Sequence, residues 1–131
     1  MAQLIEPHGG TLCELLIHGK SLEDLKKDSI HLQSITLNDR QLCDIEMLLN
    51  GSFSPLKGFL SEEDYISVIN DLHLKDGIIW PIPITLDIKE DLSENIQIGD
   101  KIVLRDHEGV AIAILSVSDK WTPDRINEAK L

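Results

Sequence analysis

The clearest helical pattern in the chain lies in residues 38–50, where apolar side chains return every three or four positions. This spacing places them on one face of a helix and leaves the charged positions on the opposite face. The expected inner face consists of Leu42, Ile45, Leu48 and Leu49. The expected outer face consists of Asp39, Arg40 and Asp44. Asn38, with Gln41 three residues later, predicts a capping box at the helix start, and Gly51 predicts a left-handed residue at its end.

A second helical pattern follows an elbow at residues 51–60. Ser61 and Asp64 have the spacing of another capping box. The apolar stripe expected after this cap consists of Tyr65, Val68, Ile69 and Leu72. The elbow is rich in glycine, serine and proline, but it also carries Phe53 and Phe59. We expect these two rings to be buried between the helix ends, where alanine at either position would cost about 3–5 kcal/mol.

Alternation of apolar and polar positions predicts strands in residues 30–35 and 78–88. The second stretch has the more regular period of two, and one of its faces is expected to join the core. Pro81 and Pro83 lack backbone N–H groups on the same side of this strand. That part of the strand is therefore expected at an edge, a bulge or a crossing point rather than in the middle of a sheet.

A hairpin is predicted from residues 101–105 and 110–118, joined by a turn at Asp106–Gly109. The second of these strands is apolar at both alternating sets of positions, so both of its faces are expected to be covered. Together with the helices, the predicted strands indicate an α+β fold that contains a curled, partly closed β-barrel.

Three shorter signals complete the secondary-structure prediction. Residues 4–12 combine a short apolar start with proline and paired glycines, which predicts an extended start followed by a turn. Ser21 and Asp24 predict the N-cap of a polar helix. The acidic stretch at residues 87–94 predicts a solvated connection with a short helix near Leu92.

The chain length of 131 residues is typical of a single domain with one core. The composition, 42% apolar and 27% charged, is that of a globular protein rather than a disordered one. No apolar run approaches the ~20 residues that span a bilayer, and the first residues lack the pattern of a secretory signal. The expected location is therefore the cytoplasm.

The formal net charge of −11 disfavours nucleic-acid binding, because an acidic surface repels phosphate groups. Lys26 and Lys27 form the one adjacent basic pair, and acidic residues flank it. Cys13 and Cys43 are too few for a disulfide scaffold and too far apart for a metal-binding knuckle. We expect both cysteines to be small buried side chains in a reducing compartment.

The sequence lacks the short motifs that mark phosphate-binding loops, zinc proteases, serine hydrolases and paired-cysteine sites. His8 lies beside two glycines and is interpreted as a structural hydrogen-bonding residue. A helix dipole favours negative charge in the first turn, which accounts for Glu62, Glu63 and Asp64. Solvation, or pairing with Arg40, accounts for Asp44 and Glu46. We therefore expect no catalytic, cofactor-binding or metal-binding residue in this chain.

Three motifs occur in a fixed order. The first is Pro7-His8-Gly9-Gly10. The second is Leu37-x-x-Arg40-Gln41-Leu42-Cys43-Asp44-x-Glu46-x-x-Leu49-Asn50-Gly51-x-Phe53-Ser54-Pro55-Leu56-x-Gly58-Phe59. The third is Trp80-Pro81-Ile82-Pro83-Ile84-Thr85-Leu86-Asp87. With these motifs, residues 5–129 resemble the N-terminal domain of ATP sulfurylase (sulfate adenylyltransferase), a domain with a PUA-like barrel.

The resemblance implies a parent enzyme that converts ATP and sulfate to adenosine 5′-phosphosulfate and pyrophosphate, with Mg²⁺ expected on the ATP. Family members carry the substrate contacts in a later domain, on a Gln-x-Arg-Asn-Pro-x-His motif and a His-rich loop, and neither occurs in these 131 residues. The match at Asp119-x-Trp121-x-Pro123 implies that the chain stops before the end of the N-terminal domain. The resemblance thus implies that this chain is an inactive scaffold within a larger enzyme. Its implied partners are the catalytic domain of the same polypeptide and other copies of the parent enzyme.

Two alternatives to this interpretation follow from the same residues. In the first alternative, the chain is a free-standing PUA-like interaction or RNA-binding module, which needs a basic face that the composition disfavours. The other alternative is a compact enzyme with a cryptic site around His8, Arg40 and His73. The sequence leaves open the oligomeric state, the direction of the reaction and the presence of an adenylylsulfate kinase domain in the parent.

Overall fold

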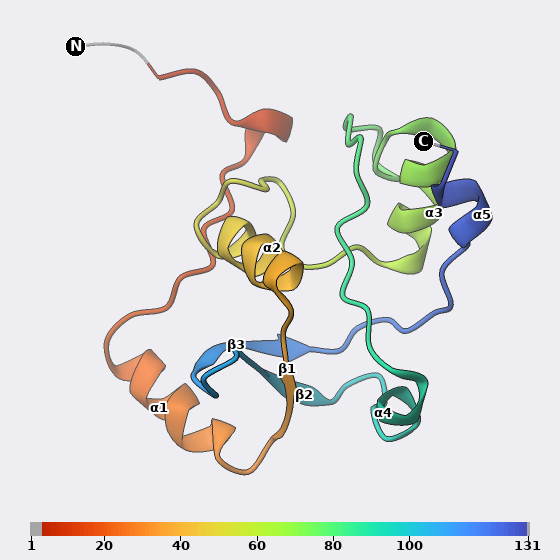
Figure 1. Ribbon diagram of the computed structural model, residues 1–131. Helices are drawn as coiled ribbons and strands as arrows, with labels where there is room; N and C mark the ends of the chain where they lie inside the picture. Colours follow the sequence, from red (N-terminus) through yellow and green to blue (C-terminus); the bar gives the residue numbers. More distant parts are fainter. Residues whose placement is uncertain (1–3, 131) are drawn as a thin grey trace. The chain divides into compact units, whose positions relative to one another are not determined.

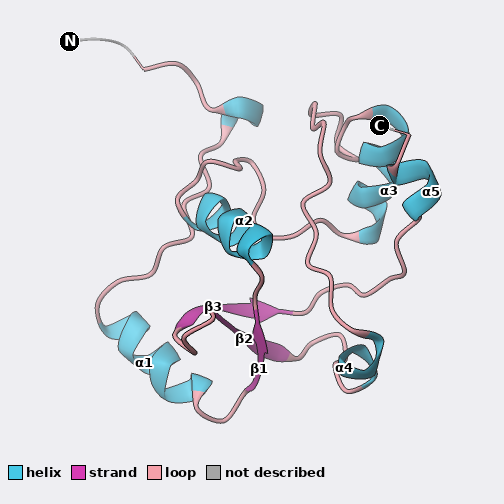
Figure 2. Ribbon diagram, viewed as in Figure 1, coloured by secondary structure: helices cyan, strands magenta, loops and turns pink. Residues whose placement is uncertain are grey.

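The computed structural model describes residues 4–130, and Figures 1 and 2 show its helices and strands. The chain divides into two compact units. The first unit contains the chain up to Gly58 together with Lys101–Ser116. The second contains Phe59–Asp100 together with the chain from Val117 onward. Each unit therefore combines two segments that are distant in the sequence.

The first unit is built around a three-stranded sheet of β1 (Gln33–Thr36), β2 (Lys101–Arg105) and β3 (Ala111–Ser116). Strand β2 lies in the middle, parallel to β1 and antiparallel to β3 (Figure 2). The predicted hairpin of β2 and β3 is confirmed. The three central residues of β2 are buried, so both faces of this strand are covered. They are Ile102, Val103 and Leu104.

The sheet is open, with β1 and β3 at its edges, and strands within residues 4–130 do not close it into a barrel. Strand β1 begins at Gln33, later than predicted, because Ile30 is 74% exposed and lies outside the sheet. The expectation that β3 is covered on both faces is wrong. Ala111 and Ile112 are exposed, and the next three residues are only half-buried. Its apolar sequence therefore belongs to an edge strand.

The helix predicted in residues 38–50 is α2 (Asp39–Leu49), and its capping box is complete. The Asn38 side chain accepts a hydrogen bond from the Gln41 backbone N–H at 2.9 Å, and Gln41 Oε1 accepts one from the Asn38 N–H at 2.9 Å. The buried face differs from the predicted one, because it includes Gln41 of the capping box, whereas Leu42 and Leu49 are only half-buried. The fully buried residues are Gln41, Ile45 and Leu48.

Replacing Asn38 with alanine is expected to lower the free energy of unfolding by about 1 kcal/mol, because the Gln41 N–H loses its acceptor. The denaturant midpoint measures this change. Glu46→Ala is a matched control at an exposed position of the same helix, and its expected effect is within about 0.5 kcal/mol. An Asn38→Ala midpoint equal to that of the control would contradict the role of the cap.

The N-terminal segment is fixed to the elbow by backbone and hydroxyl contacts. The Cys13 N–H donates to Ser54 Oγ at 2.8 Å, and the Ser54 hydroxyl donates to the Gly51 carbonyl at 2.6 Å. Gly51 has the predicted positive φ, +86°, and an added Cβ would lie 3.1 Å from Leu12 Cδ1. The backbone conformation therefore favours glycine, and any larger residue would also have to displace the Leu12 side chain slightly. Cys13 is buried as expected, whereas the expectation for Cys43 is wrong, because it is exposed on α2.

The predicted polar helix near the N-terminus is α1 (Lys20–Ser29), which lies against β3. Its N-cap is Gly19 and not Ser21, so the predicted cap is wrong. The predicted turn before it is a short 3₁₀ helix, η1 (His8–Gly10). Gly9 and Gly10 both have positive φ there, which agrees with a turn that glycine makes possible.

The second unit contains the helices α3 (Glu62–Asp71), α4 (Glu90–Glu94) and α5 (Arg125–Glu128). Ser61 caps α3 as predicted, accepting a hydrogen bond from the Asp64 N–H at 3.3 Å. The buried face of α3 consists of Tyr65, Val68 and Ile69. Leu72 does not extend this stripe, because it ends the helix in a left-handed conformation and is 42% exposed. Helix α4 confirms the short helix predicted near Leu92.

No strand forms in residues 78–88, contrary to the prediction, and the nearest ladder contact is one isolated bridge between His73 and Ile79. The segment is extended and is held by single backbone hydrogen bonds, such as Leu60 N–H to the Ile84 carbonyl at 2.9 Å. Trp80 and Ile84 are buried. The alternating pattern follows burial only in part, because Ile82 belongs to the same set of positions and is 63% exposed. The two prolines prevent a regular ladder.

The elbow rings are less buried than predicted. Phe53, in the first unit, and Phe59, in the second, are both half-buried. Their replacement by alanine is therefore expected to cost less than the value for a fully buried ring. Among residues 4–130, no helix has the length and the apolar content that crossing a membrane requires.

Candidate functional site

The segment after Val117 connects the ends of two helices in the second unit. The Asp119 carboxylate accepts a hydrogen bond from the Glu62 N–H, at 2.7 Å, in the first turn of α3. Lys120 Nζ donates to the carbonyls of Ser93 and Ile96, at 2.8 and 2.9 Å, at the end of α4. An anion at a helix start and a cation near a helix end both match the helix dipoles. Asp119 and Lys120 therefore fix this segment to α3 and α4.

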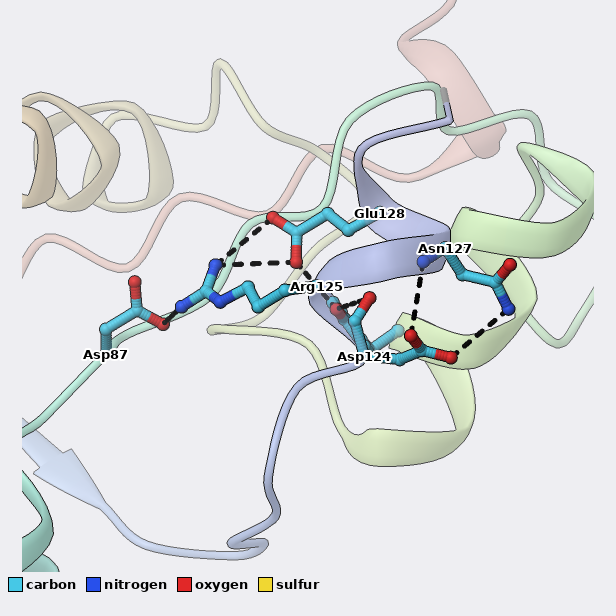
Figure 3. Close-up of polar contacts among 6 residues, drawn as sticks. Asp87, Asp124, Arg125, Asn127 and Glu128 are labelled. Atoms are coloured by element: carbon cyan, nitrogen blue, oxygen red, sulfur yellow. Dashed lines mark hydrogen bonds and ion pairs between the residues drawn. The ribbon is translucent and has the colours of Figure 1, made fainter.

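Helix α5 is held in place by polar contacts within the helix and with Tyr65 and Asp87 (Figure 3). The Tyr65 hydroxyl donates to Glu128 Oε2 at 2.6 Å. Arg125 pairs with Asp87 at 3.2 Å and with Glu128 at 3.4 Å. Asp124 caps the helix by accepting the Asn127 N–H at 3.1 Å. The Arg125 guanidinium faces both carboxylates, and the hydrogen bond with Asp87 raises the pKa of Arg125.

Tyr65 is the buried centre of this arrangement, with only 1% of its surface exposed. Its ring lies 5.8 Å from the Trp121 ring, tilted by 46°, a favourable geometry for two aromatic side chains. The Trp121 indole N–H is buried and has no hydrogen-bond acceptor among residues 4–130. Trp121 is therefore held by apolar packing against Tyr65 rather than by a polar contact of its indole.

Burial, followed by the hydrogen bond to Glu128, raises the pKa of Tyr65 from 10.0 to about 12. The folded protein thus keeps this proton where the unfolded chain loses it, and the free energy of unfolding is expected to fall as the pH rises from about 10 to about 12. The sequence contains a single tyrosine, so tyrosinate absorbance reports Tyr65 directly. Tyr65→Phe should flatten the pH dependence of the free energy of unfolding in this range. A Tyr65 pKa of about 10 in the folded protein would contradict the hydrogen bond with Glu128.

A cleft of about 390 Å³ opens in the second unit between the extended residues 85–88, α4 and residues 120–125. Its apolar lining consists of Leu86, Ile88, Trp121 and Pro123. Its uncharged polar lining consists of Thr85, Ser93 and Thr122. Its charged lining consists of Asp87, Glu90, Lys120 and Arg125. The charges balance, and both cations already contact protein oxygens, so the cleft has little capacity to attract a polyanion.

The residues that the sequence analysis considered for chemistry are distributed over both units. His8 is exposed in η1 and Arg40 is exposed on α2, both in the first unit. In the second unit, His73 Nδ1 lies 2.6 Å from the Asp71 carbonyl oxygen. Burial raises the pKa of Asp44, and the positive charge of Arg40 opposes this shift. No group of three His, Cys, Asp or Glu side chains within residues 4–130 is placed to hold a metal ion.

The acidic cluster at the start of α3 lies in the first helical turn, as interpreted from the sequence. Glu63 pairs with Lys75 at 3.1 Å, and Asp64 accepts the Lys75 N–H at 2.9 Å. These carboxylates therefore stabilise the helix start and the turn that follows α3. Glu62 contributes its backbone N–H to Asp119.

Sequence reasoning missed the contacts that hold α5. Tyr65 and Glu128 are 63 residues apart, and no local spacing pairs them. One signal was present, because Asp124 and Asn127 have the separation of an N-cap and the residue that it caps. The pairing of Arg125 with Asp87 had no signal in the sequence.

A family model described as "PUA-like domain" matches residues 5–131. The chain belongs to the PUA-like domain family. This PUA-like domain is 43% identical over 127 residues to a sulfate adenylyltransferase from Eremothecium gossypii, a match that covers 96% of the chain and 25% of the relative. It is also 43% identical over 127 residues to a sulfate adenylyltransferase from Persephonella marina, covering 97% of the chain and 33% of that relative.

A solved structure, described as a hexameric APS kinase from Thiobacillus denitrificans, has the same fold. Its TM-score with the PUA-like domain is 0.82 at 40% sequence identity. The match covers 92% of this chain and 24% of that one. The PUA-like domain thus spans about a quarter to a third of the length of these relatives and corresponds to their N-terminal part.

Proposed function

We propose that this chain is the N-terminal, non-catalytic scaffold domain of an ATP sulfurylase. The parent enzyme converts ATP and sulfate to adenosine 5′-phosphosulfate and pyrophosphate. The observation that carries the proposal is the alignment of 96% of the chain with 25% of a sulfate adenylyltransferase. A match that is nearly complete for the chain and short for the relative is what an individual domain of a larger enzyme gives.

The charges of the described residues support a role without chemistry. Attack of sulfate on the α-phosphorus of ATP needs several cationic or backbone donors around the charge that develops on phosphate and pyrophosphate. In the second unit, Arg125 is paired with two carboxylates and Lys120 with two carbonyls. We therefore place the ATP, its Mg²⁺ and the catalytic groups on the rest of the parent enzyme, with no catalytic, cofactor or metal residue in this chain.

The partner in this proposal is the catalytic domain of the same polypeptide, and the parent enzyme forms homo-oligomers in the cytoplasm. The net charge of −11 supports the absence of a nucleic-acid or membrane partner. The 131 residues act as one N-terminal domain, whose sheet is part of the curled, partly closed barrel of a PUA-like fold. The match of the family model to residues 5–131 supports this assignment.

Pyrophosphate release tests the proposal. The isolated 131-residue chain is expected to release no pyrophosphate from ATP in the presence of sulfate, whereas the full-length product of its gene is expected to do so. Omission of sulfate is the control for ordinary ATP hydrolysis. Sulfate-dependent turnover by the isolated chain, or a natural stop codon directly after Leu131, would overturn the proposal.

A further inference from the structure

Asn50 is the one asparagine in the sequence that is followed by glycine, and it is the C-cap of α2. Asn50 and Ser52 are exposed, whereas Gly51 between them is buried. The Ser52 N–H donates to Asn50 Oδ1 at 2.9 Å. This hydrogen bond closes an Asx turn, a ring of atoms that contains both the carboxamide carbon of Asn50 and the backbone nitrogen of Gly51. The turn therefore holds these two atoms close together, as a reaction between them requires.

The Gly51 nitrogen is available for such a reaction. Within the described part of the chain its N–H donates no hydrogen bond, whereas the N–H groups of Asn50 and Ser52 both do. Attack by this nitrogen on Asn50 Cγ moves negative charge onto Oδ1, which the Ser52 N–H already contacts. A donor that is in place before the charge develops stabilises the transition state. Glycine also has no side chain to obstruct the approach.

A second Asx turn in the chain differs at its glycine nitrogen. Asp76 Oδ1 accepts the Ile78 N–H at 3.2 Å, and Gly77 has a φ of +92°, close to the +86° of Gly51. The Gly77 N–H, however, donates to the Leu74 carbonyl at 2.9 Å. Attack by the Gly77 nitrogen first has to break this hydrogen bond. The chain thus contains one turn whose glycine nitrogen is ready to react and one whose glycine nitrogen is protected.

We propose that Asn50 is a site of spontaneous covalent modification, at which the folded protein converts the carboxamide to a carboxylate through a succinimide. The Gly51 nitrogen loses its proton to water and bonds to Cγ, and the side-chain nitrogen leaves as ammonia. Water then opens the ring. Cleavage of the bond between Cγ and the ring nitrogen gives aspartate, whereas cleavage at the backbone carbonyl carbon gives isoaspartate, whose main chain runs through Cγ. Water is the co-reactant, so this chemistry does not depend on the proposed function.

Isoaspartate at position 50 is expected to loosen the N-terminal segment, because it adds one methylene to the main chain between α2 and Gly51. The Gly51 carbonyl accepts the Ser54 hydroxyl at 2.6 Å, and Ser54 Oγ accepts the Cys13 N–H at 2.8 Å. The Leu12 side chain also lies close to Gly51. A shift of Gly51 therefore disturbs the series of hydrogen bonds that ends at Cys13.

Incubation of the folded chain in heavy-oxygen water at neutral pH measures the reaction. Mass spectrometry of peptides detects each converted asparagine by the oxygen that it gains, and resistance to a protease that cleaves before aspartate identifies isoaspartate. A synthetic peptide of residues 44–58, too short for a stable helix in water, gives the rate without the tertiary structure. Asp76→Asn is the matched control, because it puts an asparagine before the glycine whose nitrogen is hydrogen-bonded.

Asn50 is expected to convert in the folded chain at least as fast as in the peptide. It is also expected to convert at least about tenfold faster than the asparagine introduced at position 76, which reacts only when the hydrogen bond of Gly77 opens. A rate at Asn50 below that of the peptide, or equal rates at the two positions, would overturn the site. The comparison with the peptide uses the unmutated chain, so it stands even where Asp76→Asn disturbs folding.

Hydrogen exchange tests the structural consequence. In the isoaspartate form, the Cys13 amide is expected to exchange at least about tenfold faster than in the unmodified chain, because its acceptor on Ser54 is displaced. The amide of Val103, buried in the central strand β2, is expected to keep its rate. Unchanged exchange at Cys13 would contradict the loosening, and equally faster exchange at both amides would show general destabilisation in its place.

Discussion

Replacing Tyr65 with alanine is expected to lower the free energy of unfolding by about 3–5 kcal/mol, as for other buried aromatic residues. The ring is 1% exposed and packs against Trp121, so its removal leaves a cavity. The hydroxyl also donates to Glu128, which helps to hold α5. A loss of this size is a large part of the stability of a small domain. Chemical denaturation followed by tryptophan fluorescence measures it.

Tyr65→Phe separates the two contributions of this residue. It keeps the ring and removes only the hydroxyl, so the expected loss is about 1 kcal/mol. Glu128 retains its ion pair with Arg125 in this variant. If Tyr65→Ala and Tyr65→Phe unfolded at the same denaturant concentration, ring packing would not be the main contribution of Tyr65.

Leu104→Ala is expected to lower the free energy of unfolding by about 2–5 kcal/mol. Leu104 is 1% exposed in the central strand β2. Its neighbours in register are Ala113 on β3 and Ile35 on β1. Because the side chain opposite on β3 is already an alanine, that strand offers no large group to fill the cavity. The denaturant midpoint again gives the change.

Ile112→Ala is the matched control for Leu104→Ala. It removes a β-branched apolar side chain from β3, where 38% of the residue is exposed, so the expected loss is about 1 kcal/mol. A loss for Ile112→Ala as large as that for Leu104→Ala would show that β3 is covered on its outer side in solution. The same result would restore the prediction that both faces of this strand are buried.

Local signals in the sequence correctly predicted the elements that depend on neighbouring residues. The caps at Asn38 and Ser61, the positive φ at Gly51 and the hairpin of β2 and β3 each rest on residues a few positions apart. Their physical causes, a side-chain acceptor for an N–H or a glycine that tolerates positive φ, are complete within that distance. The cap predicted at Ser21 is an exception, because α1 is capped by Gly19 instead.

Predictions that depended on the identity of a distant partner were wrong or incomplete. The alternation in residues 78–88 predicts a strand, but no strand within residues 4–130 pairs with this segment. The apolar sequence of β3 was read as a covered strand, but β3 is an edge. Cys43 was expected to be buried, yet it faces outward on α2 because the buried face is centred on Ile45 and Leu48.

The sequence by itself determined the family, the starts of α2 and α3, the turn at Gly51 and the small number of clustered positive charges. Only the tertiary structure decided the contacts of the candidate site: Tyr65 with Glu128, Asp87 with Arg125, and Lys120 with the end of α4. These pairs join segments that are 24–63 residues apart, and they form only once packing brings the segments together. Helical spacing and capping act over one turn, whereas a cleft requires walls from several parts of a folded chain.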